Sequence, residues 1–402
     1  MRSVVRWPTL FILLTLAACG SGADTTLNPP KIDTLPGGIV HVRNTGPTAW
    51  TDTNGWKLVQ VAAINPPDGS PGELGAIDAI ALGDDGSVYA FQRAPATIKV
   101  FGPDGSYVRN IGREGDGPGE IRGGMLAVRG DTVVVQDPNG HRLTFLKADG
   151  TFIRTVQSTC CYWTTTFVID SAGLIWSPGS VGGKGEGGWI RFRMDGTIRD
   201  TILMPPSAYS SSSVKFWTVE LKSGSNSSSM MMGIPLQPST WRFLRADGAG
   251  VVGNTDRLSF AVLGNGKDSS RVFEAAAPRL PLSDTERDSV FETSISGQQE
   301  QWRSALRKSA KKADLPAEWP AWTHAASDQS ARLWVSLPGK RGEITRVVVF
   351  DSDGRLLGDV PPPSPKMFNH DAWSRDRLAF LDEDGEGRTV IRVFRLVTKP
   401  GK

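Results

Sequence analysis

The stretch whose residue types most suggest chemistry is GREGDGPGE at 112–120, which combines glycines, carboxylates and an arginine. Such a loop could cradle a phosphate or hold a cation. A phosphate loop needs a strand, then the glycines, then a helix N-terminus, whereas here the glycines precede another strand-like segment. A matching stretch, NPPDGSPGELGAI at 65–77, places Glu73 47 residues before Glu120. We therefore interpret both loops as structural turns, in which the glutamate accepts hydrogen bonds from backbone N–H groups.

Metal-ligating and nucleophilic side chains stand in no recognisable motif. The chain has four histidines: His41, His141, His324 and His370. None of them shares a motif at zinc-ligand spacing with another. Asp382, Asp384 and Gly385 are similar to part of a calcium loop, but the later oxygen ligands are missing, which favours an acidic hairpin. We therefore expect no cofactor. Calcium stays an alternative, because residues from distant segments could form a site that no local motif indicates.

Two adjacent cysteines, Cys160 and Cys161, lie in QSTCCYWTTT. In an oxidising compartment they could form a vicinal disulfide, and in a reducing one they would remain thiols. The neighbouring Tyr162 and Trp163 would then complete a hydrophobic contact platform. Both redox states stay open at this point.

The N-terminus indicates export. Arg2 and Arg6 precede an apolar run at 10–18, which is shorter than the roughly 20 residues that span a bilayer and is typical of a secretory signal. The sequence LAAC that ends at Cys19 resembles the bacterial lipobox, which implies cleavage before Cys19 and lipid attachment to it. The alternative is an ordinary signal peptide with a free Cys19. Gly20 is not the aspartate that retains lipoproteins at the inner membrane, so the outer membrane is favoured.

Composition separates the chain into segments of different character. Residues 1–18 form the expected signal peptide, and 19–54, rich in Gly, Pro and Thr, form an expected flexible tether. The remainder, 55–398, has soluble globular composition. With 45 Lys+Arg against 42 Asp+Glu and no basic cluster, the sequence gives no reason to expect a nucleic-acid partner. Membrane contact is expected only through the lipid on Cys19.

A repeat of about 45 residues predicts the fold. Asp-Gly pairs recur between short alternating segments, at 104–105, 149–150, 195–196 and 353–354. A second series of strand–turn–strand segments lies half a unit earlier. Asp-Gly between such segments is a strong hairpin signal, and two hairpins per unit make four antiparallel strands. Six units therefore predict an all-β, six-bladed β-propeller, with an open β-solenoid as the alternative.

Closure of the ring and two insertions complete the predicted architecture. The last unit supplies three strands, so residues 56–64 are expected to add the fourth strand beside 390–396 and remove an open edge. An insertion at 205–240 is Ser-rich and reads as flexible. The other, at 283–312, is the single helical insertion, with a capping box from Ser283 and Glu286. We expect it to lie over the ring as a lid or to support its rim.

Strand order gives each loop a face. The connections between blades and the hairpins between second and third strands share one face, opposite the Asp-Gly turns. Charged residues expected there include Asp137 and Lys340. The expected binding residues on that face are Arg113, Glu120, His141, Arg142, Arg257, Arg341, Cys160 and Cys161. The arginines indicate an anionic ligand, and the alternative is an ordinary solvated charged face.

The repeat resembles six-bladed propellers of the NHL-repeat and TolB-like type, particularly exported lipoproteins. The residues that carry this resemblance are the Asp-Gly turns, Leu-Trp-Val in ARLWVSL at 331–337, and Gly-Pro-Gly-Glu at 117–120. It covers about 56–397 and is specific for architecture rather than function.

The function expected from these features is a non-catalytic binding or scaffold module on the cell envelope, for a protein, peptide or glycan. It would be an exported lipoprotein, periplasmic or surface facing. The resemblance also implies an alternative, a calcium- or zinc-dependent enzyme such as a lactonase-like hydrolase or a lyase. Its ligands would come from Asp137, Glu120, Asp256 and His370. A third reading is a structural subunit of an envelope complex, without a small ligand.

Overall fold

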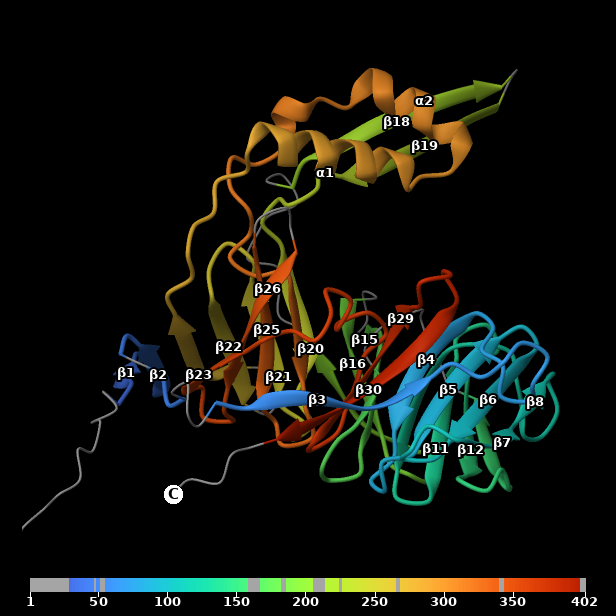
Figure 1. Ribbon diagram of the computed structural model, residues 1–402. Helices are drawn as coiled ribbons and strands as arrows, with labels where there is room; N and C mark the ends of the chain where they lie inside the picture. The colour runs from blue at the N-terminus through green and yellow to red at the C-terminus, as the bar shows by residue number, and fades with distance from the viewer. Residues whose placement is uncertain are drawn as a thin grey trace, which may run out of the picture.

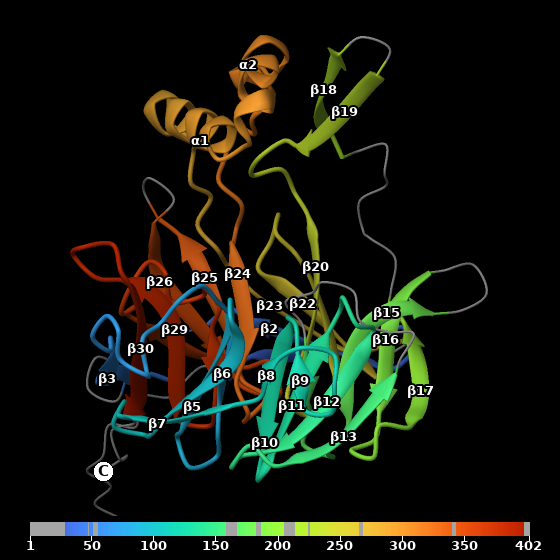
Figure 2. The same cartoon turned by 90° about the vertical axis from the view of Figure 1, so that its right-hand side faces the viewer.

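Six β-sheets stand around a common axis in the computed structural model (Figure 1 and Figure 2). The structure describes residues 29–46, 48–50, 55–157, 167–181, 186–204, 214–223, 226–264, 268–339 and 343–397. Blade 1 consists of β4 (Ile77–Leu82), β5 (Val88–Arg93), β6 (Ala96–Phe101) and β7 (Tyr107–Ile111). Blade 2 consists of β10 (Met125–Arg129), β11 (Thr132–Asp137), β12 (Arg142–Lys147) and β13 (Phe152–Gln157). Blade 3 consists of β14 (Val168–Ile169), β15 (Ile175–Val181), β16 (Glu186–Phe192) and β17 (Ile198–Leu203).

The second half of the ring repeats this arrangement. Blade 4 contains β20 (Thr240–Leu244), β21 (Gly250–Asn254), β22 (Ser259–Gly264) and β23 (Asp268–Ala275). Blade 5 consists of β24 (His324–Ser327), β25 (Leu333–Pro338), β26 (Ile344–Phe350) and β27 (Leu356–Val360). Blade 6 consists of β28 (Ala372–Trp373), β29 (Arg377–Glu383), β30 (Thr389–Val397) and β3 (Lys57–Ile64). The prediction of an all-β, six-bladed propeller is confirmed.

The recurring Asp-Gly turns are the local cause of the repeat. Gly105 and Gly150 adopt φ of 86° and 96°, which a residue with a Cβ rarely tolerates. The preceding aspartate fixes each turn, because Asp104 Oδ1 accepts a hydrogen bond from the Ser106 N–H at 3.0 Å and Asp149 does the same for Thr151 at 2.8 Å.

The ring is closed as expected, by a strand from near the N-terminus. β3 pairs antiparallel with β30, with Leu58 opposite Leu396 and Ile64 opposite Ile391. Ile64 is 1% exposed and packs in the core between blades 6 and 1. Both ends of the propeller domain are therefore held in one sheet.

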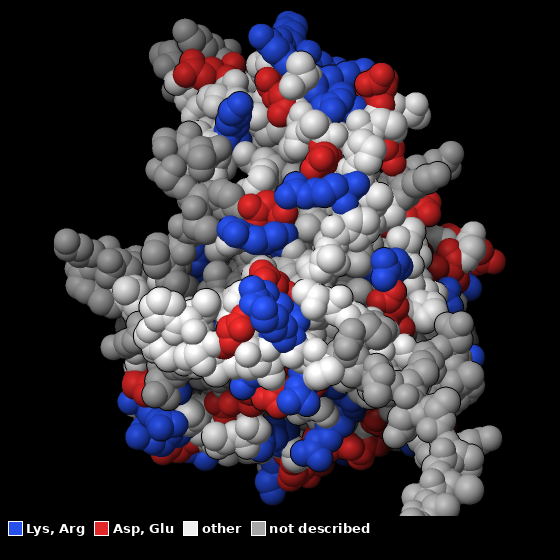
Figure 3. Space-filling model, turned by 90° about the vertical axis from the view of Figure 1, so that its left-hand side faces the viewer, with Lys and Arg blue, Asp and Glu red and all other residues white. Residues whose placement is uncertain are grey.

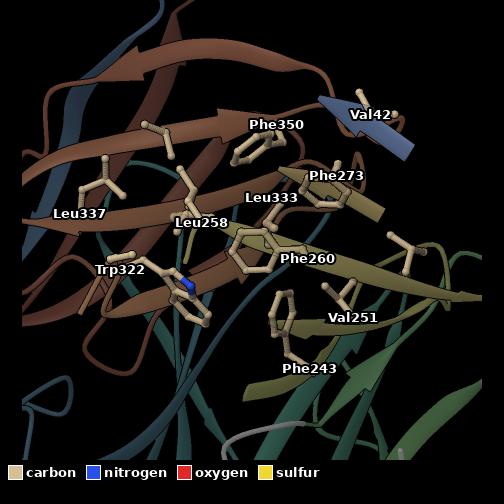
Figure 4. Close-up of a cluster of buried hydrophobic side chains, with 14 residues drawn as sticks. Val42, Phe243, Val251, Leu258, Phe260, Phe273, Trp322, Leu333, Leu337 and Phe350 are labelled. Atoms are coloured by element: carbon tan, nitrogen blue, oxygen red, sulfur yellow. The ribbon is translucent and has the colours of Figure 1, made fainter. Parts of the chain in front are cut away.

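Part of the expected tether belongs to the fold instead. Within 19–54, β1 (Lys31–Leu35) and β2 (Ile39–Asn44) form a hairpin, and β2 adds parallel to β23, which makes blade 4 six-stranded. Val42 is fully buried in the core of blades 4 and 5, beside Phe273 (Figure 4). The physical reason is that the outer edge of blade 4 exposes unpaired backbone groups, which β2 satisfies.

Tryptophans and phenylalanines fill the spaces between blades. Phe260, Phe273 and Phe350 are almost completely buried between blades 4 and 5 (Figure 4). In blades 3 and 5, a buried aspartate also accepts from an indole six residues later: Asp170 from Trp176 Nε1 at 2.7 Å, and Asp328 from Trp334 Nε1 at 2.8 Å. In both blades, this hydrogen bond joins the turn after the first strand to the second strand.

The two insertions fold together into one unit, here called the insertion unit. It contains β18 (Phe216–Ser223), β19 (Asn226–Gly233), α1 (Asp284–Ser296), α2 (Glu300–Ser309) and the 3₁₀ turn Lys312–Asp314. Trp217, Phe291 and Leu306 are buried in its own core, and Trp217 Nε1 donates to Asp314 Oδ2 at 2.9 Å. It projects from the ring in both Figure 1 and Figure 2.

The insertion unit differs from the sequence-based expectation in two ways. The single helical insertion is present as expected, but it contains two helices; Ser283 and Glu286 form the expected capping box of α1, and Gly297 is the residue that follows its end. The buried apolar residues of this segment are divided between the two helices, with Phe291 and Ile295 on α1 and Leu306 on α2. The described part of 205–240 includes the regular hairpin of β18 and β19. This hairpin is ordered because Trp217 and Val219 are buried in the core of the insertion unit. Among the described residues, no helix is long and apolar enough to span a bilayer.

Closure by β3 predicts an asymmetry between two residues of that strand. Ile64→Ala should lower the free energy of unfolding by about 2–5 kcal/mol, because it leaves a cavity between blades 6 and 1. Val59→Ala should change it by less than about 0.5 kcal/mol, since Val59 is 48% exposed. Urea titration of both variants measures the difference, and equal effects would contradict this role for β3.

Candidate functional site

Alternating strand directions place all connections between blades, and all hairpins between second and third strands, on one face of the ring. This face, here called the insertion face, also carries both insertions. Of the expected binding residues, Arg113, Glu120, His141, Arg142 and Arg257 lie in its loops or at their edges. Cys160, Cys161 and Arg341, with Lys340, fall outside the described residues, so expectations about them stay predictions.

The loop at 112–124 is a structural turn held by its glutamate. β8 (Arg113–Glu114) pairs parallel with β9 (Glu120–Ile121). The Glu120 carboxylate accepts hydrogen bonds from the Gly117 N–H at 2.7 Å and from Arg113 Nε at 2.9 Å. These two donors, the backbone N–H first, hold the pKa of Glu120 below its usual value. The carboxylate is thus engaged within its own loop.

Arg142 performs a similar internal role. Its side chain is 6% exposed and forms an ion pair with the fully buried Asp137 at 3.0 Å. It also donates to the carbonyl oxygens of Gly115 at 2.9 Å and Asp116 at 3.0 Å. Arg142 therefore fastens the loop at 112–124 to blade 2, and a ligand would not reach its guanidinium without displacing that loop.

The other described members of the expected set are exposed but separate. Arg113 is 80% exposed at its side chain, and Arg257 is 63% exposed beside Asp256 at 3.4 Å. His141 is exposed in a hairpin, with φ of 47°. On the side of the molecule shown in Figure 3, basic and acidic residues are interleaved. The structure does not gather these arginines into a single anion site.

A row of aromatic side chains, missed in the sequence analysis, lies where the innermost strands of blades 4 to 6 begin. Trp241 of β20 meets His324 of β24 edge-on, with ring centroids 6.1 Å apart. His324 stacks on Phe368 at 5.7 Å with an interplanar angle of 14°. Phe368 in turn lies 6.0 Å from Trp373 of β28. We call Trp241, His324, Phe368 and Trp373 the aromatic row.

Residues of the propeller ring hold the aromatic row in place. The Trp322 indole contacts Trp241 at 5.6 Å and donates to the carbonyls of Asn254 and Arg257, both at 3.0 Å. The His324 backbone N–H donates to the Ser336 hydroxyl at 2.8 Å. Trp241 nevertheless remains 37% exposed. His324 is exposed as well, so part of the row is accessible from solvent.

Polar groups of blades 6 and 1 lie next along the insertion face. His370, with φ of 46°, has its Nδ1 2.8 Å from the Asp78 carbonyl oxygen. That nitrogen donates the hydrogen bond, because a carbonyl oxygen can only accept one. The Asp78 carboxylate is bound by Arg93. Loss of water around Asp371 raises the pKa of its carboxyl, although the Trp373 indole donates to it.

The possible metal ligands are either scattered or engaged. Within the described ranges, no group of three His, Cys, Asp or Glu side chains is placed to hold a metal ion. The suspected calcium fragment is an acidic hairpin: Asp384 accepts from the N–H groups of Glu386 and Arg388, both at 2.9 Å, and from Arg388 Nε at 2.8 Å. These donors lower the pKa of Asp384. The Asp384 carboxylate is thus engaged within its own hairpin.

Known proteins offer distant similarity. No protein-family model matches the chain. Over 90 residues it is 30% identical to the uncharacterized protein C6orf47 homolog of Mus musculus, which covers 22% of this chain and 31% of that protein. The chain thus spans about a third of the curated relative that it matches.

Among solved structures, the chain is similar to a protein from Bacteroides fragilis described as exported, with 13% identity, TM-score 0.47, and coverage of 90% of this chain and 99% of that one. A member of the DUF4221 family from Bacteroides vulgatus gives 12% identity and TM-score 0.47 over 86% and 99% of the two chains. Virginiamycin B lyase from Staphylococcus aureus gives 12% identity and TM-score 0.40 over 85% and 100%.

The aromatic row predicts a pH effect. Loss of water around His324, which is flanked by Trp241 and Phe368, lowers the pKa of its imidazole. Between the folded and the higher unfolded pKa, the unfolded chain binds more protons, so stability falls as the pH drops through about 6.5 toward the folded pKa.

An NMR titration of the His324 ring should give a midpoint below about 6.5. The melting temperature should fall less between pH 7 and pH 5 in His324→Phe than in the unsubstituted protein. An imidazole midpoint at or above the ordinary value would contradict this account of the row.

Proposed function

We propose that this chain is an exported, lipid-anchored β-propeller that serves as a non-catalytic binding module of the cell envelope. Its insertion face would bind a protein, peptide or glycan. The observation that carries the proposal is the aromatic row, which presents Trp241, His324 and Phe368 on a fixed scaffold at one place on this face.

Physical reasons favour recognition by the row. Tryptophan and phenylalanine contribute large contact areas with little conformational entropy to lose, and they dominate the energetics of many binding surfaces. Their flat faces pack on the C–H faces of sugars and on apolar peptide side chains. The exposed Arg93 and His370 next to the row add hydrogen-bonding groups for orientation. Rigid placement lowers the cost of ordering the site on binding.

The rival function is an enzyme. His370 and Asp371 are two titratable residues that follow each other in the chain on the insertion face, and loss of water raises the pKa of the Asp371 carboxyl, a feature that acid–base catalysts share. A metal-dependent mechanism gains no support from the described residues, since Asp137 is paired with Arg142, and Glu120 is held within its loop. The binding role therefore has the stronger physical basis.

Binding through the aromatic row is tested by the double substitution Trp241→Ala and Phe368→Ala. Ligands captured from envelope extracts, or purified envelope glycans and peptides, should bind the variant at least about tenfold more weakly, as expected when two central aromatic contacts are lost. Phe152→Ala is the control, because Phe152 is 39% exposed on the outer strand β13. Identical capture by the double variant and the control would refute the proposed surface.

Anchoring is tested separately. In a bacterial host, the chain should partition into the detergent phase and carry a lipid on Cys19, detected by mass spectrometry of the N-terminal peptide. Cys19→Ser should move it to the aqueous phase. Detergent partitioning that survives this substitution would show that another segment holds the membrane.

A further inference from the structure

The outer strand of the insertion unit has a free edge. β19 pairs with β18 in a two-stranded sheet, and within the described part of the chain no other strand pairs with it. The helix α2 packs on β18, and Figure 2 shows that β19 is farther from α1 and α2 than β18 is. One side of β19 is therefore not covered by any described element of the unit.

The pairing with β18 shows which backbone groups of β19 reach this edge. Just beyond the two strands, the Ile234 N–H donates to the Lys215 carbonyl at 3.2 Å. Hydrogen-bonded pairs alternate along antiparallel strands, so the even-numbered residues of β19 direct their N–H and C=O groups toward β18. The odd-numbered residues direct theirs to the free edge: Ser227, Ser229, Met231 and Gly233.

β19 lacks the protection that exposed edges usually have. Its sequence, NSSSMMMG, contains no charged residue and no proline, and its pairing with β18 has no bulge. Charges, prolines and bulges are the devices that keep a free edge from pairing with another chain. The outer strands of the blades each carry a charged residue: Lys31 on β1, Lys57 on β3, Arg109 on β7, Arg154 on β13, Asp200 on β17 and Asp359 on β27. The edge of β19 is thus open to a further strand.

We propose that β19 pairs with β19 of a second copy of this chain, antiparallel across a two-fold axis, to form a four-stranded sheet. With the axis at Met230, Ser229 of each copy lies opposite Met231 of the other. These two residues then exchange hydrogen bonds between their N–H and C=O groups, and the remaining odd-numbered residues do the same. This proposal goes beyond the envelope-binding role and does not depend on it.

Symmetry and charge favour a second copy as the partner. Antiparallel pairing of two identical edges brings every backbone donor opposite an acceptor. Because β19 carries no charge, its side chains do not repel their own copies across the axis. Met231 is 63% exposed, and in this register it lies diagonally across the axis from Met231 of the second copy, so both lose contact with water. A two-fold interface of this kind closes at two copies.

The size and position of the hairpin suit such a sheet. A sheet of only two strands is marginally stable, and further strands strengthen it. In both Figure 1 and Figure 2 the hairpin lies on the projecting insertion unit, away from the blades. One short strand from each copy buries less than the roughly 1,200–2,000 Å² of a standard interface. We therefore expect a reversible dimer whose population rises with protein concentration.

The test uses the chain from residue 19 onward with Cys19→Ser, in reducing buffer so that no disulfide can link two copies. Sedimentation velocity over a series of protein concentrations should show the average mass rising from that of one copy toward that of two. Over the same series, hydrogen exchange should slow in 227–233, because the free N–H groups of β19 become bonded.

Matched variants assign the dimer to this edge. Met231→Lys places two ammonium groups near each other across the axis, and Ser229→Pro removes one hydrogen bond from each copy while sparing the bonds to β18. Each should raise the dissociation constant of the dimer by about tenfold or more. Thr218→Lys is the control, because Thr218 lies opposite Met231 on β18, also exposed but off the free edge. It should dimerise like the unsubstituted protein.

A protein that stays monomeric at the highest concentration accessible to sedimentation would overturn the proposal. An unchanged dissociation constant in a folded Met231→Lys variant, or equal weakening by Thr218→Lys, would overturn it as well. Slower exchange in 227–233 that requires an envelope extract would replace the second copy with a strand of another protein. If Ser229→Pro does not fold, Met231→Lys decides.

Discussion

The pairing of β3 with β30 is the constraint on which the rest of the architecture depends. A ring of sheets buries its hydrophobic faces only between neighbouring blades, so an open ring would leave two large apolar faces in water. β3 closes the last blade with a strand that comes before the first one, and Ile64 carries the packing into the core shared with blade 1. Once the ring is closed, every connection has a fixed face, and the innermost strands of successive blades begin side by side.

That geometry explains how the aromatic row and the insertion unit arise from residues far apart in the chain. The aromatic row joins the starts of inner strands of consecutive blades. The insertion unit joins two consecutive insertions that share a single core around Trp217 and Phe291. Neither insertion could bury its apolar residues alone, because a two-stranded hairpin and a pair of short helices are each too small. Their association gives one folded unit with its own core on the insertion face.

The parts of this structure that follow a local rule could be predicted from the sequence. Blade number, closure and loop facing come from Asp-Gly turns at a regular spacing, and the structural role of Glu120 follows from the absence of a helix after its glycines. The aromatic row could not be predicted, because nothing near Trp241 or Phe368 in the chain marks their meeting. The β1–β2 hairpin was missed although Pro36-Gly37-Gly38 before the alternating Ile39–Val42 was a usable signal. Its Gly- and Pro-rich composition was interpreted as a linker instead.

If Cys19 carries a lipid, as proposed, the same hairpin limits the distance between the propeller and the bilayer. Lys31, where β1 begins, follows Cys19 by only twelve residues, and a chain of that length reaches about 40 Å at full extension. Asn44 holds the end of β2 in place, since its amide nitrogen donates to the carbonyls of Glu274 and Gly354 at 3.0 Å and its side-chain oxygen accepts from the Leu356 N–H. With a lipid on Cys19, a short linker would attach the outer edge of blade 4 to the membrane. The propeller could then contact partners that lie close to the membrane surface. It could not contact partners that lie far from that surface.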